Sequence, residues 1–346
     1  MKQLAVFKNP ALFMKLLFFV MAASLIFVTT ACSQAENKDT KAQLNTDYHV
    51  HIQSPEMGTI LAGYCGKMLE CDPETLSRGS SADDLLLHLK NSRINRVVIM
   101  STAYQAAMPE FNLSANQQKQ LTRRENDYIA GQISQSEKLL GFFSVNPLSS
   151  FAVEESQYWI KRGELSGLKL HFANSAVDLH NPEHIEKIQE LLDAVDNDRM
   201  TILIHLRTRN PDYGPSEAEI FFKNLMPHIK NARVIIAHAG GWGGYDDATH
   251  ATLQKFIEII NNNRQISDRI YLGVGAIIMP SLADDRKTLF VKTFRTLNIK
   301  NWLFGSDWFP GSNEIGYDLY LAELKKAGLT DAEITELIGN RLPFVQ

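Results

Sequence analysis

The sequence is poor in cysteine and has no block of like charge. Only three of its 346 residues are cysteines, and 35 basic residues stand against 39 acidic ones, for a formal net charge of −4. The slight acidic excess and the lack of a basic cluster disfavour nucleic acid as a partner. Hydrophobic residues make up 45% of the chain, which is typical of a soluble globular protein of one large domain or two smaller ones.

Two widespread catalytic signatures are also missing. The sequence contains no Gly-x-Ser-x-Gly elbow, and this absence disfavours a serine hydrolase. Gly273-Val274-Gly275 lacks the third glycine and the following helix of a dinucleotide site. Any catalytic chemistry must therefore rest on other residues.

The longest apolar run lies near the N-terminus, where Lys15 precedes residues 16–28. The run is too short for a comfortable membrane span and fits the core of a signal peptide. It ends at Ala31-Cys32-Ser33, which resembles a bacterial lipobox, although Thr29 replaces the usual aliphatic residue. We expect residues 1–31 to be a lipoprotein signal peptide and Cys32 to carry a lipid. Simple secretion and a retained anchor helix are the alternatives.

Residues 32–45 are polar and show no hydrophobic period, as expected of a flexible tether. The folded part would then touch a membrane through its lipid only and face the periplasm from the bacterial cell envelope. Secretion would instead release it into the periplasm. Met14 begins a more typical signal peptide than Met1 does, so both are candidate first residues.

Two cysteines remain for the folded part, Cys65 and Cys71. Their separation suits a small disulfide loop, and disulfides persist in an oxidising periplasm. The spacing matches no zinc knuckle. We expect the disulfide, with two free thiols or a functional thiol as the alternatives.

From residue 46 onward, apolar strand patterns alternate with amphipathic helical patterns. Eight strands alternating with eight helices, without a break in composition, predict a single-domain (β/α)8 TIM barrel over residues 46–346. The expected strands lie near residues 47–52, 95–101, 139–146, 166–172, 200–206, 233–239, 269–276 and 302–307. The expected helices span residues 82–91, 117–136, 150–162, 182–195, 216–226, 248–262, 284–296 and 316–326, with a last one at 331–338.

Two connections are long, at residues 53–81 and 102–116. Each follows a strand, and loops that follow strands lie on the catalytic face of a barrel. We therefore expect both segments to cover the site and to shape substrate choice.

Five side chains of the metal-ligand type stand at the ends of four expected strands. His49 and His51 close the first strand, His205 the fifth, His238 the sixth and Asp307 the eighth. Because side chains alternate along a strand, His49 and His51 face the same side and can hold one ion. Imidazole and carboxylate suit zinc or a similar divalent metal, so the pattern predicts a metal-dependent enzyme.

Six motifs occur in a fixed order: Asp47-Tyr48-His49-Val50-His51, Gly167-Leu168-Lys169-Leu170-His171, Ile204-His205, Ile236-Ala237-His238-Ala239-Gly240-Gly241, Leu303-Phe304-Gly305-Ser306-Asp307-Trp308 and Gly339-Asn340-Arg341. This set resembles the amidohydrolase superfamily, and within it amidohydrolase family 2, from residue 46 to the end. The resemblance implies one divalent ion, zinc first among the candidates, held by His49, His51, His205 and Asp307.

The resemblance also assigns catalytic roles. Asp307 can contact the activated water and take its proton, while His238 orients that water or steadies the oxyanion that forms. A second role for His238, as a further metal ligand, stays open. The family includes both lactone hydrolases and non-oxidative decarboxylases.

Five residues are candidates for substrate contact. Lys169 and His171 share a face of the expected fourth strand, where a substrate contact, a structural ion pair and, for Lys169, a bridging position between two metal ions are the alternatives. Arg207 and Arg209 follow His205 and could grip a carboxylate in bidentate fashion, or form a solvated loop pair. Trp308 adjoins Asp307.

Three functions compete. The first is a metal-dependent hydrolase that attacks the carbonyl carbon of a small lactone, ester or amide. The second is a metal-dependent decarboxylase of a small unsaturated or aromatic acid, and the third is a non-catalytic surface lipoprotein that binds ligands. The expected partner is a small molecule, carboxylate-bearing in the decarboxylase case, and self-association is compatible with the sequence.

Overall fold

The computed structural model describes residues 44–67, 71–309 and 316–342. The expected signal peptide, Cys32, which we expected to carry a lipid, and nearly all of the expected tether lie outside these described residues. Within them, no helix is long and apolar enough to cross a membrane.

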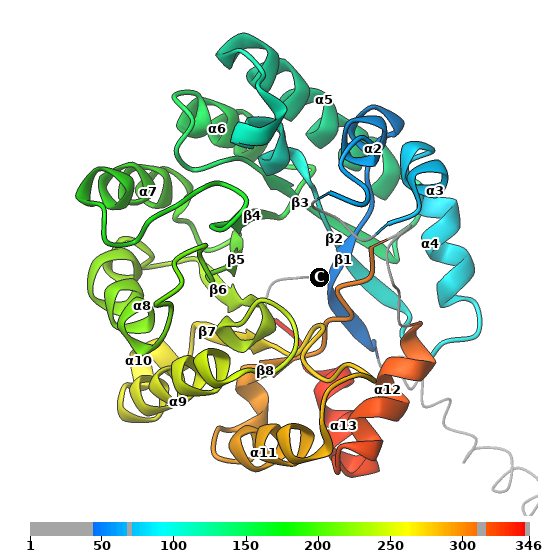
Figure 1. The fold of residues 1–346 in the computed structure, drawn as a ribbon, viewed down its shortest axis with the longest axis vertical. Coiled ribbons are helices and arrows are strands. Elements are labelled where there is room, and N and C mark those ends of the chain that lie inside the picture. Colours follow the sequence, from blue (N-terminus) through cyan, green and yellow to red (C-terminus); the bar gives the residue numbers. More distant parts are fainter. Residues whose placement is uncertain (1–43, 68–70, 310–315, 343–346) are drawn as a thin grey trace, which may run out of the picture. The chain divides into compact units, whose positions relative to one another are not determined.

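Eight parallel strands form one sheet in chain order (Figure 1). The barrel closes where the Tyr48 backbone N–H donates to Phe304 O over 2.9 Å and Val50 pairs with Trp308. The architecture is therefore the expected (β/α)8 barrel. The strands are β1 (Thr46–His51), β2 (Arg96–Met100), β3 (Leu139–Ser144), β4 (Gly167–His171), β5 (Thr201–His205), β6 (Arg233–Ile236), β7 (Ile270–Gly273) and β8 (Trp302–Leu303).

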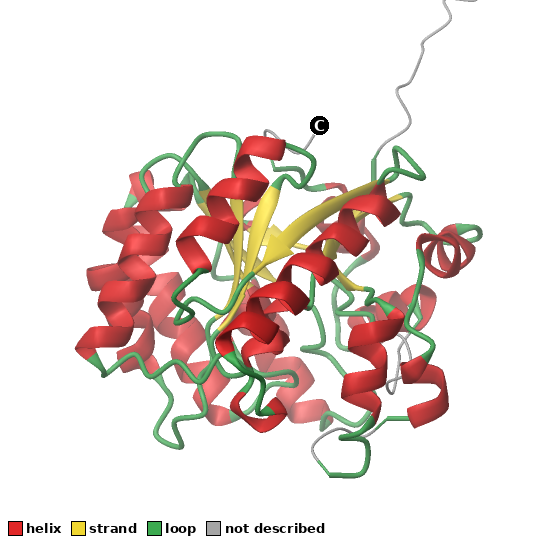
Figure 2. Cartoon of the chain, turned by 90° about the horizontal axis from the view of Figure 1, so that it is seen from above, coloured by secondary structure: helices red, strands yellow, loops and turns green. Residues whose placement is uncertain are grey.

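Helices surround the strands on all sides (Figures 1 and 2). Those that follow the strands are α4 (Ala82–Leu89), α5 (Ala115–Ile133), α6 (Ala152–Arg162), α7 (Pro182–Val195), α8 (Pro215–Ile220), α9 (Asp247–Asn262), α11 (Asp284–Phe294) and α12 (Tyr317–Lys326). Shorter or additional helices are α2 (Pro55–Ala62), α3 (Pro73–Ser77), α10 (Arg264–Ser267) and α13 (Asp331–Gly339). The expected helices coincide with observed ones, because their apolar faces pack on the sheet.

Two apolar layers stabilise the barrel. One fills its interior and includes Tyr48, Phe142, Leu203 and Leu303. The other lies between the strands and the helices, where burial of aliphatic and aromatic side chains supplies most of the stabilising free energy. The inner layer fills part of the barrel and leaves the carboxyl ends of the strands to polar residues.

The insertion after β1 contains structure that the sequence patterns did not indicate. Helices α2 and α3 lie within the segment expected to be a loop. They form a small apolar cluster with residues of the 102–121 region, including Met57, Leu76 and Leu121. A disulfide joins Cys65 to Cys71 beside this cluster. Both long connections therefore belong to one packed unit.

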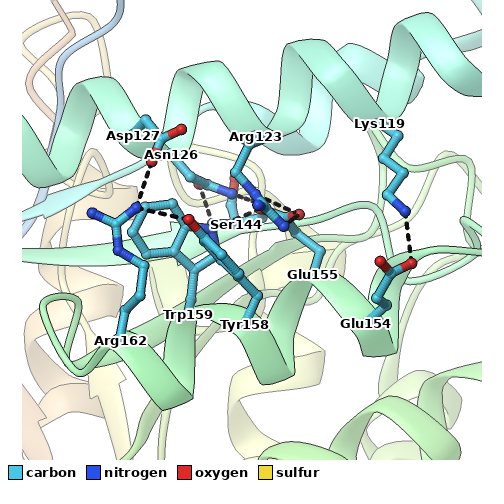
Figure 3. A network of polar contacts seen from close by, with 10 residues as sticks. All are labelled: Lys119, Arg123, Asn126, Asp127, Ser144, Glu154, Glu155, Tyr158, Trp159 and Arg162. Carbon is cyan, nitrogen blue, oxygen red and sulfur yellow. Dashed lines mark hydrogen bonds and ion pairs between the residues drawn. The ribbon is translucent and has the colours of Figure 1, made fainter.

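A polar network joins α5 to α6 on the outside of the barrel (Figure 3). Glu155 is fully buried and accepts from Arg123 Nη2 over 2.6 Å and from Trp159 Nε1 over 2.7 Å. The Arg123 guanidinium also lies over the Tyr158 ring, 3.4 Å from its centroid. Arg162 pairs with Asp127 at the far end of the network, and Lys119 pairs with Glu154 at the other end.

Candidate metal centre

The five predicted side chains meet at the carboxyl end of the barrel. His49 and His51 lie on β1 and His205 ends β5, whereas His238 and Asp307 lie just beyond β6 and β8. His238 and Asp307 have positive φ angles of 53° and 59°. Such backbone conformations are uncommon for residues other than glycine and cluster at functional sites.

Three ligand atoms lie at nearly equal separations. His49 Nε2 is 3.1 Å from His51 Nε2, and Asp307 Oδ1 is 3.2 Å from the first and 3.4 Å from the second. Donors at the corners of a tetrahedron around zinc, with bonds of about 2.0–2.1 Å, are about 3.3 Å apart. The donors and their spacing therefore fit a divalent metal ion.

His238 is held in a defined tautomer. Its Nδ1 lies 2.7 Å from the carbonyl oxygen of Gly275, which can only accept, so Nδ1 must carry the hydrogen. In the neutral ring, Nε2 then presents a lone pair, and it lies 3.8 Å from Asp307 Oδ2. The ligand atoms of His49, His238 and Asp307 all lie within 4.8 Å of one another. This geometry is compatible with both roles foreseen for His238.

His205 lies beside this group. Its ring stacks on His171 with centroids 3.9 Å apart and planes inclined by 9°, and its centroid is 5.2 Å from that of His238. The Nδ1 atoms of His205 and His51 are buried without a hydrogen-bond partner. Unpaired buried nitrogen atoms carry a free-energy penalty unless a ligand or water satisfies them.

Lys169 points at the same group from β4. Its Nζ lies 3.1 Å from His49 Nε2, and the side chain is almost fully buried. Burial lowers the pKa of Lys169 to about 7, with Asp307 opposing the shift. The lysine is therefore placed to contact the metal or a bound substrate, as two of its three predicted roles require.

The histidines are kept neutral and the aspartate is kept ionised. Burial lowers the pKa of His49, His171 and His205 well below the usual value, and neighbouring positive groups add to the effect. Burial opposes ionisation of Asp307, but the surrounding imidazoles, His49 foremost, hold its pKa well below the usual range. Neutral imidazoles and a carboxylate are the forms that bind a metal ion.

Asp47 ties the two sides of the centre together. Its Oδ1 accepts from the backbone N–H of His49 over 2.9 Å and of Ser306 over 3.1 Å, and its Oδ2 accepts from Ser306 Oγ over 2.5 Å. The Asp307 N–H in turn donates to His49 O over 2.8 Å. These bonds fix the backbone of Asp307 relative to β1, which preorganises the ligand atoms.

The two predicted arginines are already paired. Arg207 Nη1 lies 2.8 Å from an Asp246 carboxylate oxygen, and Arg209 Nη1 lies 2.6 Å from one of Glu110. Each guanidinium must give up or share its partner to bind a substrate carboxylate. The Arg209 pair also joins the 102–116 connection to the loop after β5.

Trp308 packs away from the metal centre. Its ring lies 4.8 Å from His88 on α4, and the side chain belongs to the layer between strands and helices. Trp308 is therefore poorly placed for the substrate contact that we expected. Its backbone does serve the site, because its carbonyl accepts from the His51 N–H over 2.8 Å.

Three aromatic residues at the mouth were not among the predicted site residues. Tyr104 lies 5.0 Å from the ring of His171, and Phe309 lies 5.9 Å from that of His51. Trp242 lies 5.2 Å from the ring of His205. The sequence contains a signal for the neighbourhood of each: glycines flank Trp242, Tyr104 lies in the 102–116 connection that we expected to cover the site, and Phe309 follows Trp308.

Comparisons with known proteins support the fold. No protein-family model and no curated protein matches the sequence. Solved structures do match over most of both chains: the apo form of IDCase from Metarhizium anisopliae is 14% identical, with 87% of this chain and 96% of that chain covered and a TM-score of 0.56.

Two further matches carry metal ions. A 5-carboxyvanillate decarboxylase mutant from Novosphingobium aromaticivorans, with manganese and a nitrobenzoic acid bound, is 9% identical, with 88% of this chain and 96% of that chain covered and a TM-score of 0.57. An amidohydrolase from Burkholderia multivorans with bound zinc is 12% identical, with 86% and 96% covered and a TM-score of 0.54. The chain therefore has the barrel fold of solved amidohydrolase-superfamily proteins.

Proposed function

We propose that this barrel, folded like the solved amidohydrolases, is a metal-dependent enzyme of that superfamily acting on the carbonyl or carboxyl group of a small molecule. The observation that carries the proposal is the convergence of His49 Nε2, His51 Nε2 and Asp307 Oδ1 within 3.1–3.4 Å of one another. No comparable spacing is needed for a barrel that only binds ligands.

These three side chains would hold one divalent ion, zinc first among the candidates, with His205 or His238 completing the set. A bound ion of this kind lowers the pKa of water and polarises a carbonyl group. Asp307 is ionised, and its Oδ2, which is not one of the three converging atoms, would take a proton from the attacking water. His238 would orient that water, because its Nε2 lone pair can accept a hydrogen bond from it.

Hydrolysis of a small lactone, ester or amide is the reaction that these roles support. The alternative is decarboxylation, and the position of Lys169 favours it as a second candidate. A buried amine 3.1 Å from His49 Nε2 can pair with a substrate carboxylate next to the metal. Release of carbon dioxide from a set of unsaturated acids separates the two reactions.

Metal analysis tests the proposal. The purified protein should contain about one equivalent of a divalent ion, as expected for a mononuclear site. The His49→Ala, His51→Ala double variant should lose that ion, whereas His228→Ala should keep it, because His228 pairs with Asp193 away from the barrel mouth. A metal-free wild-type protein would refute the proposal, and two equivalents would assign Lys169 a bridging position.

We also propose that the enzyme works at the bacterial cell envelope, lipid-anchored through Cys32. The lipobox-like end of the N-terminal apolar run motivates this proposal. The Cys65–Cys71 disulfide supports it, because such bonds persist in oxidising compartments. Cys32→Ala should abolish labelling with a fatty acid and move the protein from the membrane fraction to the soluble fraction. A wild-type protein that is soluble and unlabelled would contradict it.

A further inference from the structure

Trp242 is the exposed aromatic residue of the barrel mouth. About half of its surface, 49%, is open to solvent, although tryptophan is normally well buried. The other large hydrophobic residues exposed among the described residues, Leu87 and Leu319, are single side chains on helices α4 and α12. Isolated exposed leucines need no explanation, whereas an exposed indole beside a cluster of buried histidines does.

The loop that carries Trp242 is anchored at both ends. On its N-terminal side, Tyr213 Oη donates to Gly240 O over 2.6 Å. On its C-terminal side, the Gly244 N–H donates to Ala276 O over 2.7 Å. These bonds hold the backbone on both sides of the indole.

At two positions of this loop only glycine fits without strain. A Cβ on Gly241 would lie 2.6 Å from Thr249 Cγ2, and Gly244 has a φ of +74°, which other residues rarely adopt. The run of glycines therefore permits a close-packed turn against α9. Trp242 is presented in a defined place and is not the tip of a loose lid.

The indole stands against two of the predicted site residues. Its ring centroid is 5.2 Å from that of His205 at an interplanar angle of 88°, and 6.1 Å from that of His171 at 80°. Those two imidazoles are stacked on each other, so the indole stands upright beside the pair. One wall of the mouth is thus aromatic and lies next to the ligand cluster.

We propose that Trp242 is a specificity-determining residue that receives the flat face of a planar, unsaturated substrate. The inference rests on the proposed function, because the substrate's carbonyl or carboxyl group would be directed to the metal while its conjugated part lies against the indole. Small-molecule sites combine such an apolar aromatic wall with a few polar groups that fix orientation. Aromatic surfaces also prefer flat or edge-on partners to rounded aliphatic ones.

The test compares two carboxylates of similar size with the zinc-loaded protein. Benzoate is flat, whereas cyclohexanecarboxylate is not, and both present the same group to the metal. Calorimetric titration should show tighter binding of benzoate, and Trp242→Leu, which keeps an apolar side chain, should reduce that preference by roughly 2- to 12-fold. Trp242→Phe should retain most of it, and Leu319→Ala should leave it unchanged.

Tryptophan fluorescence provides a second measurement. Trp159 and Trp302 are fully buried and Trp308 is 5% exposed, so quenching by acrylamide should act mainly on Trp242. Saturating benzoate should protect this emission from quenching in the wild-type protein. Protection by cyclohexanecarboxylate to the same extent would count against the proposal.

The outcomes separate the inference from the proposed function. If the wild-type protein holds zinc but binds both carboxylates equally, or binds neither, the role of Trp242 is refuted and the metal centre stands. If Trp242→Leu keeps the full preference for benzoate, the role is likewise refuted. If the wild-type protein holds no zinc, the proposed function itself fails, which the metal analysis shows independently.

Discussion

Two buried polar clusters of this barrel are built in opposite ways. In the network between α5 and α6, the buried carboxylate of Glu155 meets the Arg123 guanidinium and the Trp159 N–H (Figure 3). At the barrel mouth, the Nδ1 atoms of His51 and His205 have no hydrogen-bond partner, while His51 Nε2 faces His49 and Asp307. The first cluster is complete within the protein, and the second is not.

This difference indicates that the α5–α6 network stabilises the fold, whereas the cluster at the mouth serves function. A buried charge is stable when an opposite charge and hydrogen bonds surround it, and the α5–α6 network meets that condition with its own side chains. At the mouth, burial lowers the pKa of His49, and the imidazoles hold the pKa of Asp307 down although burial acts to raise it. Such perturbed groups in one place are characteristic of functional sites, because a ligand or metal completes them.

The largest expected effect comes from the mouth. Asp307→Asn removes the proposed proton acceptor and weakens the metal site, so kcat on a hydrolysed substrate should fall by about 10²–10⁴-fold. Glu155→Gln, the matched change in the α5–α6 network, should leave kcat within about twofold of wild type for enzyme that is still folded. Equal losses in the two variants would erase the distinction between the clusters.

His238→Asn tests how the mouth divides its tasks. If His238 orients the attacking water, kcat should fall by about 10²–10⁴-fold while the metal stays bound. Metal content and rate measured on the same preparation decide the point. Loss of the metal as complete as in the His49, His51 double variant would make His238 a ligand, which its Nε2 position also allows.

Glu155→Ala should lower stability and leave the metal centre unchanged. The variant leaves the Arg123 guanidinium and the Trp159 N–H without their acceptor, and it should lower the free energy of unfolding by about 3 kcal/mol. The metal content of folded protein should not change. The Arg123→Met, Glu155→Leu double variant should be more stable than Glu155→Ala, since it leaves no unpaired charge. A loss below the error of urea unfolding would show that the network contributes little.

The smallest effect concerns pH. Burial holds the pKa of His171 well below 6.5, so between the two values the unfolded chain binds a proton that the folded protein does not. This difference lowers stability as pH falls below 6.5, by at most about 1.4 kcal/mol per pH unit. His171→Gln should therefore flatten the decline in stability of the metal-free protein from pH 7.5 to 5.5. If the free energy of unfolding of His171→Gln falls with pH as steeply as that of the wild type, the lowered pKa of His171 is refuted. His228→Gln serves as the control.

Much of the fold could be read from local patterns. Sequence patterns placed all eight strands and the helices between them, because strands buried on both faces read as short apolar runs and helices with one buried face show a period of 3.6 residues. Helices α2 and α3 escaped notice, since they are short and bury their apolar residues against a distant segment around Leu121. Strand β8 has two residues where six were expected, because the chain turns into the Asp307 loop.

By itself, the sequence determined which chemical groups reach the barrel mouth, because the carboxyl ends of parallel strands converge whatever the loops do. Tertiary structure decided how those groups lie there. The positions of His205 and His238 relative to Asp307 depend on the contact between the two imidazole rings, which come from different strands. The pairing of Arg209 with Glu110 joins residues 99 positions apart. Distances of that kind follow from non-local packing and from unusual backbone angles at His238 and Asp307, which no local pattern encodes.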